Sequence, residues 1–365
     1  MTATSFDLWA PFVMAGIIAA ACTPFAILIA PKIGAMDIPK DNRRVHNKPM
    51  PRFGGISMYI GIMAALAVFA VGDKEIAAVM VGCTLIYIMG VIDDLKNTRP
   101  VFKMAGQVLC ATVTFAMGLR IEFITNYFGE GNMMFGMAAC YIITIIWLVG
   151  ITNALNLIDG LDGLAAGISV ISALCIAYVS YIHGEYITTI GMMIVAGAAI
   201  GFLPFNYHPA KIFMGDGGSQ LLGFAIAALS IIGTVKSATV VVVVIPALVL
   251  GLPILDTAMA IIRRTRRGQS IVMADKEHLH HRIIKAGFGQ RRAVMLMYSV
   301  SGIMGIVAIL YSRGLYVECL GLAIIAIIIV GVILTDTGRN KIQLKGRRIL
   351  REDLSDKDYK YNKYK

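Results

Sequence analysis

A group of polar residues follows a long apolar segment in the middle of the chain, from Asn153 to Gly163. Asn153, Asn156, Asp159 and Asp162 lie three positions apart in turn, a spacing that places them on one face of a helical turn. One Asp is enough to cap the next helix, so four aligned polar residues favour a binding site. Carboxylates at the edge of a hydrocarbon layer are costly without a cation, and no Lys or Arg lies beside these in the sequence. We therefore expect a ligand to supply the positive charge.

Two adjacent acids, Asp93 and Asp94, end another apolar segment. Neighbouring carboxylates repel each other, which raises the pKa of one of them unless a cation lies nearby. Lys96 and Arg99 are close enough in sequence to pair with them. Magnesium is the alternative, because it binds one or two carboxylates together with phosphate oxygens and water.

Asp216 lies between glycines in the segment KIFMGDGGSQ, where a further apolar segment begins. Free backbone N–H groups at the amino end of a helix favour phosphate, although the pattern is not that of a P-loop. Phe213, just before it, could stack on a planar base or anchor the chain at a membrane interface. This segment is a second candidate for phosphate or metal binding.

Three histidines, His278, His280 and His281, follow an arginine-rich stretch at 263–267. A zinc site would need a fourth ligand, and none is evident at a suitable spacing. A solvated interfacial loop is the plainer interpretation. Next to acids and magnesium, imidazoles suit the binding of a diphosphate or proton handling near neutral pH.

Asp256 is an acid inside an apolar helix that Gly251 and Pro253 should kink. It could pair with Arg263 or lie near the polar loops. We expect its role to be structural.

The composition shows which elements must position these residues. Of 365 residues, 58% are hydrophobic and only 15% are charged, so the chain is expected to be an all-α polytopic integral membrane protein. A membrane-spanning helix needs roughly 20 apolar residues. Eleven such segments are expected, approximately 8–30, 55–72, 76–92, 102–119, 134–151, 164–182, 187–203, 219–235, 239–262, 294–312 and 317–335.

The distribution of basic residues predicts the orientation. With the amino terminus outside, 29 of the 33 Lys and Arg residues fall on the cytoplasmic side, and the odd number of spans places the carboxyl terminus in the cytoplasm. The net charge of +11 therefore reflects topology and contact with the membrane surface, and nucleic acid is not an expected partner. No Lys or Arg precedes Lys32, so the first segment is expected to be a retained span.

The domain organisation is expected to be simple: a transmembrane domain over 1–335 and a basic cytoplasmic tail over 336–365. The six cysteines all fall in apolar segments without close pairs, so they are expected to pack as thiols. Most of the acid, amide and imidazole groups lie on the predicted cytoplasmic side, and the expected site faces the cytoplasm.

Together these motifs resemble the polyprenyl-phosphate N-acetylhexosamine-1-phosphate transferase superfamily, the family 4 glycosyltransferases. The resemblance runs from HNKPMPRFGG at 46–55 to HLHH at 278–281, with four motifs in the family's order. It implies an acidic pair at Asp93 and Asp94, a metal-binding acid at Asp216 and a uridine-stacking ring at Phe213. The early basic motif matches His46, Lys48 and Arg52. His-Leu-His-His resembles the branch that uses UDP-N-acetylglucosamine.

The resemblance implies that an undecaprenyl phosphate oxygen attacks the sugar-side phosphorus of UDP-N-acetylglucosamine, giving undecaprenyl-diphosphate-N-acetylglucosamine and UMP. Mg²⁺, or Mn²⁺ in its place, would be held by Asn156 and Asp216. Asp93 and Asp94 would lie near the metal and the lipid phosphate. The implied catalytic residues are Asp93, Asp94, Asp216, His280 and His281. The remaining implied substrate contacts are Lys48, Arg52, Asn153, Asp159, Asp162, Asn206, Phe213 and His278.

Two alternatives remain open at this stage. The phospho-N-acetylmuramoyl-pentapeptide transferase of peptidoglycan synthesis belongs to the same superfamily. A cation-coupled secondary transporter would also combine acids with a kinked helix, but its ionisable groups would lie near the bilayer midplane and its halves would repeat. The downstream polymer (teichoic acid, O-antigen or another envelope polysaccharide) and a homodimer are also left open.

Overall fold

The computed structural model describes residues 5–38, 49–125, 132–236, 246–266, 268, 279–285 and 287–326. It is almost entirely helical, and helices overlap all eleven of the expected apolar segments. The main helices are α1 (Ser5–Ile33), α2 (Gly55–Phe69), α3 (Lys74–Lys96), α4 (Pro100–Ala116), α5 (Met137–Ile158), α6 (Leu164–Ile182), α7 (Tyr186–Asn206), α8 (Gly215–Lys236), α10 (Gly251–Arg266), α11 (Leu279–Lys285) and α12 (Gln290–Ser312).

Among the described residues, seven helices are long and apolar enough to cross a membrane: α1, α3, α5, α6, α7, α8 and α12. Three more apolar helices, α2, α4 and Tyr316–Ala326, are shorter. The chain is therefore a multi-pass membrane protein. The number of eleven spans and the orientation of the two ends stay predictions, as does the tail at 336–365, which lies outside the described residues.

Helix α8 lies at the centre of the bundle. In the apolar stretch of α8, 94% is buried inside the protein, whereas in that of α1 only 22% is buried. Helix α1 therefore lies at the periphery of the bundle. Helices α2, α3, α5, α6 and α7 all pack against α8. Lipid tails give helices no hydrophobic reason to associate, so small residues that allow close approach matter more than in soluble bundles. At the contact between α1 and α7, a Cβ on Gly197 would lie 2.1 Å from the backbone oxygen of Phe12.

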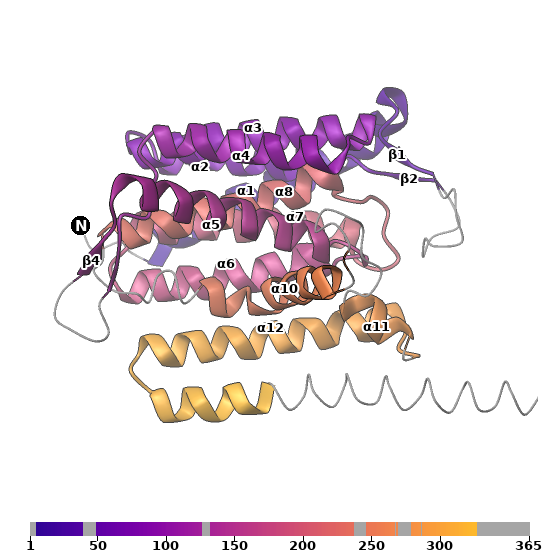
Figure 1. Ribbon diagram of the computed structural model, residues 1–365. Coiled ribbons are helices and arrows are strands. Elements are labelled where there is room, and N and C mark those ends of the chain that lie inside the picture. The colour runs from indigo at the N-terminus through magenta and orange to yellow at the C-terminus, as the bar shows by residue number, and fades with distance from the viewer. Residues whose placement is uncertain are drawn as a thin grey trace, which may run out of the picture.

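Figure 1 shows the helices side by side, with two small strand pairs near opposite ends of the bundle. Strands β1 (Met36–Asp37) and β2 (Met50–Pro51) pair antiparallel at one end, and β3 (Phe123–Thr125) and β4 (Asn132–Met134) pair at the other. The connections after α3, α5 and α7 lie at the β1–β2 end. We call this the site end, because the polar motifs of the sequence lie there.

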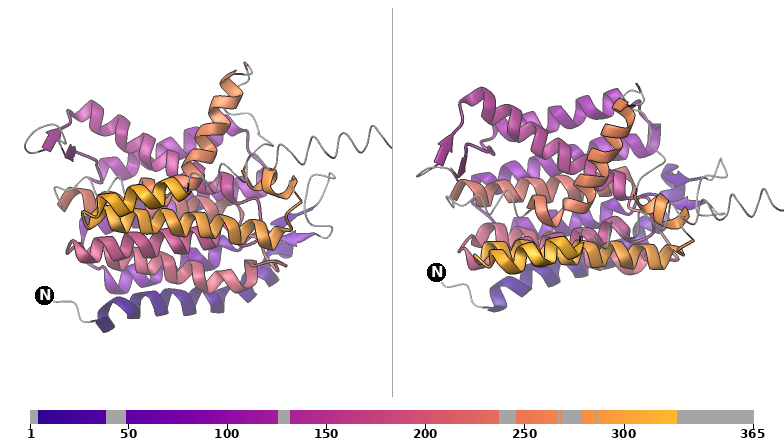
Figure 2. Two further views of the ribbon diagram at one scale, coloured as in Figure 1. Left: turned by 90° about the horizontal axis from the view of Figure 1, so that it is seen from below. Right: turned by 60° about the horizontal axis from the view of Figure 1, so that its bottom comes forward.

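Helix α10 departs from the common direction. Figure 2 shows it running across the other helices. Leu255 and Met259 on it are exposed, while Asp256 is buried. The Asp256 Oδ1 atom accepts a hydrogen bond of 2.9 Å from Leu279 N, the first residue of α11, so this acid caps the next helix.

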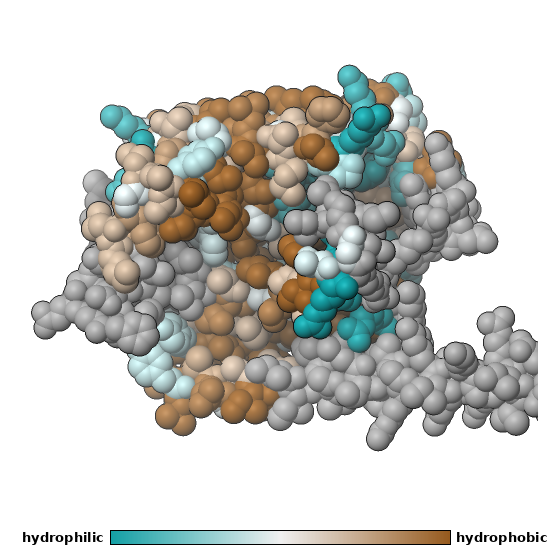
Figure 3. Space-filling model, in the orientation of Figure 1, coloured by the Kyte–Doolittle hydropathy of each residue, from teal (hydrophilic) through white to brown (hydrophobic). Residues whose placement is uncertain are grey.

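The surface agrees with a membrane setting. Figure 3 shows apolar residues over the middle of the visible face and hydrophilic residues mainly nearer its ends. All six cysteines are free thiols, as expected.

Candidate active site

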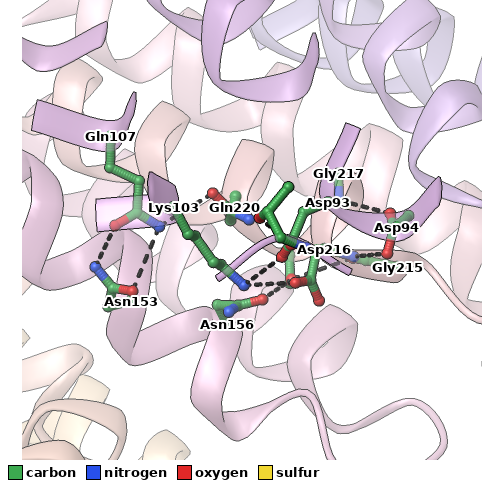
Figure 4. A network of polar contacts seen from close by, with 12 residues as sticks. Asp93, Asp94, Lys103, Gln107, Asn153, Asn156, Gly215, Asp216, Gly217 and Gln220 are labelled. Carbon is green, nitrogen blue, oxygen red and sulfur yellow. Dashed lines mark hydrogen bonds and ion pairs between the residues drawn. The ribbon is translucent and has the colours of Figure 1, made fainter. Parts of the chain in front are cut away.

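Three carboxylates from two helices meet at the site end (Figure 4). Asp93 and Asp94 come from the last turns of α3, and Asp216 comes from the first turn of α8. The two helices approach closely because both have glycine at the contact. A Cβ on Gly90 would lie 2.5 Å from the Cα of Gly217, so a larger residue would push α3 away from α8.

The amino end of α8 is capped by Asp94. Its Oδ1 accepts from Asp216 N at 2.8 Å, and its Oδ2 accepts from Gly217 N at 3.0 Å. A carboxylate at this position satisfies free amide groups and also faces the positive end of the helix dipole. We expected these N–H groups to be free for phosphate, and that expectation is wrong: a side chain of the protein already occupies them.

The positive charge at the carboxylates comes from distant parts of the chain. Arg52 contacts Asp94 Oδ1 through Nε at 3.0 Å and Asp216 Oδ1 through Nη2 at 2.6 Å. Lys103 Nζ contacts Asp93 Oδ2 at 3.0 Å and Asp216 Oδ2 at 2.5 Å. The ligand that we expected to supply positive charge was inferred for the Asn153–Asp162 group and stays a prediction there, whereas Asp216 has two cations of the protein itself. Two cations already lie among three acids.

Asp93 has a local partner in addition. Its Oδ1 accepts hydrogen bonds from Thr98 N at 2.9 Å and from Thr98 Oγ1 at 2.5 Å. The cations that we had considered for the acidic pair were Lys96 and Arg99. Instead, Asp93 contacts Thr98 and Lys103, and Asp94 contacts Arg52 and the backbone of α8.

Asp159 follows the last residue of α5 and belongs to the same electrostatic group. Burial raises its pKa to about 7, and the charges of Asp216, Asp94 and Asp162 add to this rise while Arg52 opposes it. Burial disfavours the charged form of Arg52, but Asp94, Asp216 and Asp159 outweigh it and raise the pKa of Arg52 above its ordinary value. The site therefore holds an excess of acid, part of which can be neutral near pH 7.

Asn153 and Asn156 lie on adjacent turns of α5 and have different surroundings. Asn156 Oδ1 accepts a hydrogen bond of 2.7 Å from Ser219 Oγ of α8, which brings it to the first turns of that helix. Asn153 donates to Gln107 Oε1 at 2.6 Å, and Gln107 donates to Gln220 Oε1 at 3.0 Å. Asn153 is thus held by internal hydrogen bonds, and its contact with substrate stays a prediction.

Side chains from other helices hold the loop at 159–163. Asn206 is buried, accepts from Gly163 N at 3.1 Å and donates to Ile212 O at 2.9 Å. Tyr298 of α12 donates to Gly163 O at 2.6 Å. We expected Asn206 to hold the nucleotide. Its hydrogen bonds are internal, so the structure gives it a role in positioning the loop.

Asp162 and Phe213 lie at the same end of the bundle. Asp162 Oδ2 is 2.8 Å from His208 Nδ1 and accepts from Ala210 N at 3.1 Å. The backbone of Phe213 is fixed by hydrogen bonds to Pro51 O and from Gly54 N, which ties the α7–α8 connection to β2 and the start of α2. Nucleotide binding by either residue stays a prediction.

The basic and histidine motifs are the part of the site that the structure describes least. His46, Lys48 and His278 lie outside the described residues, and so do the side chains of His280 and His281, whose backbone belongs to α11. Of the early basic motif, Arg52 lies at the carboxylates.

Sequence reasoning missed Lys103, Gln107, Ser219, Gln220, His208 and Tyr298 at this end of the bundle. One signal was present. Lys103 and Gln107 are four residues apart in an otherwise apolar helix, and therefore on one face of it.

The oxygen groups of this site can be compared with the ligands that a magnesium ion prefers. Carboxylate and amide oxygens are the ligands that Mg²⁺ prefers, and three carboxylates share two cations here. Among the residues that the structure describes, no group of three or more His, Cys, Asp or Glu side chains is already arranged as a metal site. The residues fit the ion by chemistry and charge, and magnesium dependence itself stays a proposal.

The fold and the site define a multi-pass membrane protein with three carboxylates and two cations gathered at one end of its helical bundle. The family model of Glycosyl transferase family 4 matches residues 76–234, which include Asp93, Asp94, the Asn153–Asp162 motif and Asp216.

Curated relatives extend this match over most of the chain. A probable undecaprenyl-phosphate N-acetylglucosaminyl 1-phosphate transferase of Bacillus subtilis is 39% identical over 317 residues, 87% of this chain and 88% of the relative. A decaprenyl-phosphate N-acetylglucosaminephosphotransferase of Mycolicibacterium smegmatis is 36% identical over 88% of this chain and 87% of its own. An undecaprenyl-phosphate alpha-N-acetylglucosaminyl 1-phosphate transferase of Escherichia coli is 28% identical, over 78% and 79%. The chain belongs to the glycosyl transferase family 4.

Proposed function

We propose that this protein transfers N-acetylglucosamine 1-phosphate from UDP-N-acetylglucosamine to undecaprenyl phosphate and releases UMP. The names of the relatives support the donor sugar and the lipid acceptor. The observation that carries the proposal is the meeting of Asp93, Asp94 and Asp216 with Arg52 and Lys103 at one end of a membrane bundle. We further propose that the protein lies in the cytoplasmic membrane with this end facing the cytoplasm.

The reaction brings two anions together, a diphosphate and a lipid phosphate, so positive charge at the reacting phosphorus is the main requirement. Arg52 and Lys103 suit this task because each contacts Asp216 and one acid of the pair. Either side chain can turn a donor group toward a phosphate oxygen and keep its second carboxylate partner. The remaining contact then orients the side chain that holds the phosphate.

Asn156 and Asp216 are the proposed ligands of Mg²⁺, which would neutralise charge on the diphosphate and polarise its oxygens. Asn156 is held toward α8 by Ser219, and Asp216 is positioned by its place in the first turn of α8. Asp94 would keep that turn in place through its two backbone hydrogen bonds. No general base is required, since a lipid phosphate is already largely ionised at neutral pH.

Asp159 is suited to hold a proton near neutral pH, because burial raises its pKa to about 7. In its neutral form it can donate a hydrogen bond to an oxygen of the nucleotide or the sugar, which an ionised carboxylate cannot. The loop that holds it is fixed by Asn206 and Tyr298. We therefore place the nucleotide at this loop.

The test uses detergent-solubilised protein with undecaprenyl phosphate, magnesium and one of several UDP-sugars. We expect UMP release and a lipid diphosphate product with UDP-N-acetylglucosamine. Release only with the muramyl-pentapeptide nucleotide would place the protein in the peptidoglycan branch. Absence of UMP release with every nucleotide, under conditions where the melting temperature shows folded protein, would contradict the transferase proposal and favour transport.

A further inference from the structure

Three amide side chains, two of them fully buried and one half-buried, form a layer beneath the acid cluster, on the side toward the middle of the bundle. The amide layer consists of Gln107 on α4, Asn153 on α5 and Gln220 on α8. Gln107 exchanges hydrogen bonds with Asn153 in both directions, at 2.6 and 3.3 Å, and donates to Gln220 at 3.0 Å. Figure 4 shows these contacts beside those of Lys103 and Asp216.

Each member of the layer lies one helical turn from a residue of the proposed reaction centre. Gln107 is four residues after Lys103, Gln220 is four after Asp216, and Asn153 is three before Asn156. Residues three or four apart share one face of a helix. A hydrogen bond that fixes the direction of the amide therefore also fixes the direction of the reacting side chain on the same helix.

The direction of each reacting side chain matters because a small rotation of its helix about the helix axis has a large effect on the reaction rate. A side chain lies about 6 Å from its helix axis, so a rotation of about 10° moves its end by about 1 Å. Errors of that size at a reacting group cost about a hundredfold in rate. Apolar contacts between helices in lipid specify such a rotation poorly, whereas a hydrogen bond between amides requires one distance and one direction.

A contribution to folding stability does not by itself explain the amide layer. Gln107 and Gln220 are each 1% exposed, so both amides are fully removed from solvent. The Gln220 Nε2 group has no hydrogen-bond partner within the part of the chain that the structure describes. A pair of methionines would fill nearly the same volume without leaving a buried donor unsatisfied. What the amides add is therefore a fixed arrangement of three helices.

We infer that Gln107, Asn153 and Gln220 are positioning residues that set the rotation of α4, α5 and α8, and so hold Lys103, Asn156 and Asp216 in register for phosphoryl transfer. The inference rests on the proposed function for its kinetic consequences. Its structural content, the coupled rotation of the three helices, is independent of the reaction.

The kinetic test compares Gln107→Met, Gln220→Met and the double variant with the wild type by UMP release. We expect each single variant to lower kcat about a hundredfold, with KM for the nucleotide unchanged and with half-saturation by magnesium shifted upward. The double variant should lose no more than the worse single variant, because the amides act as a unit. Its melting temperature should equal or exceed that of the wild type.

Two matched controls tie the same helices together at other positions. Tyr141→Phe removes the 3.0 Å contact with Thr112 between α4 and α5, and Ser230→Ala removes the 3.1 Å bond from Trp147 between α5 and α8. Both should leave kcat and the magnesium dependence unchanged. If the double methionine variant keeps the wild-type kcat and magnesium dependence, or if the controls lose activity equally, the inference is wrong.

A readout without turnover separates this inference from the proposed function. Spin labels at Leu109 of α4 and Ile146 of α5, both exposed, report the relative rotation of the two helices. In a chain whose native cysteines are replaced, the distance distribution from electron paramagnetic resonance should broaden in the Gln107→Met/Gln220→Met background. An unchanged distribution would overturn the inference. If the distance distribution broadens in a protein that releases no UMP, the inference about helix rotation stands and the proposed function is wrong.

Discussion

The two ends of the bundle use the same types of residue in different ways. At the end opposite the site, Arg120 lies over the ring of Phe115 at 5.0 Å and Arg313 over that of Tyr178 at 5.4 Å. Asp73 there caps its own helix through Glu75 N and Ile76 N. At the site end, Arg52 and Lys103 lie between three carboxylates contributed by α3 and α8.

The contacts at the end opposite the site anchor local structure, whereas the ion pairs at the site end are suited to function. A cation over an aromatic ring, or an acid at the start of its own helix, is a local and partly solvated contact that costs little. A cluster of partly buried acids and cations loses part of its hydration, and the ion pairs offset that loss only in part. The site end therefore contains charges that stability does not require, which is typical of a binding or catalytic centre.

The largest expected effect is that of Asp216→Asn. Asp216 contacts both cations of the site and is the proposed magnesium ligand, so its loss should lower turnover roughly a thousandfold or more while the protein still inserts. The measurement is UMP release over a magnesium titration, with the melting temperature in the same detergent. Near-normal turnover at low magnesium would contradict the assignment.

Lys103→Met should lower activity almost as much as Asp216→Asn, and it should lower stability more. It removes a cation that contacts Asp93 and Asp216, and because these side chains are partly exposed the cost stays below the roughly 3–5 kcal/mol of a fully buried pair. We expect at least a hundredfold loss of kcat/KM and a lower melting temperature. Lys96→Met, on the exposed end of α3, is the matched control and should change neither. Equal effects of both variants would show that net charge matters and that the position of Lys103 does not.

The third prediction concerns the pH dependence of stability in protein free of nucleotide and divalent ions. The pKa of Asp159 is about 7 in the folded state, above its ordinary value, so between about pH 4 and pH 7 the folded state binds more protons than the unfolded state. Its contribution to the free energy of unfolding is therefore present at low pH and is lost as the pH rises through about 7.

Thermal unfolding from pH 5 to pH 8 tests this. The melting temperature of Asp159→Asn should fall less with rising pH than that of the wild type. Parallel curves for the two proteins would mean that Asp159 is ionised throughout this range.

Asp256→Ala tests a buried acid away from the ion-pair cluster. Because Asp256 accepts from the first amide of α11, the substitution removes a helix cap, at a cost of about 1 kcal/mol. The melting temperature should fall while kcat changes by less than about threefold. A large loss of kcat without destabilisation would move Asp256 into the reaction centre.

Arg313→Ala should have the smallest effect. The contacts of this guanidinium are with the ring and hydroxyl of Tyr178 at the end opposite the site, and an exposed cation–π pair contributes about 0.5–1 kcal/mol. Turnover should be that of the wild type. A loss of activity would show that the two ends are coupled, and the comparison between them would need revision.

The sequence by itself determined the helical membrane class and most helix positions. The segment expected at 164–182 is helix α6 with the same bounds, and the third and fifth segments differ from their helices mainly at the ends. These features are local, because the thickness of the hydrocarbon layer sets a minimum length for any apolar segment that spans it. The acids and amides were identified for a related reason: a polar residue in or beside an apolar segment needs a partner.

Only the tertiary structure decided which partners meet. Asp216 pairs with Arg52, 164 residues away, and with Lys103, 113 residues away. These pairs depend on how closely α3 approaches α8 and on the rotation of α4, and neither is encoded by local hydropathy. Asn206 and Asn153 illustrate the same limit: the family resemblance implied that both contact the substrate, but only packing could show that their amides bind other parts of the protein. A residue's type is local, whereas its contacts depend on distances that the whole bundle sets.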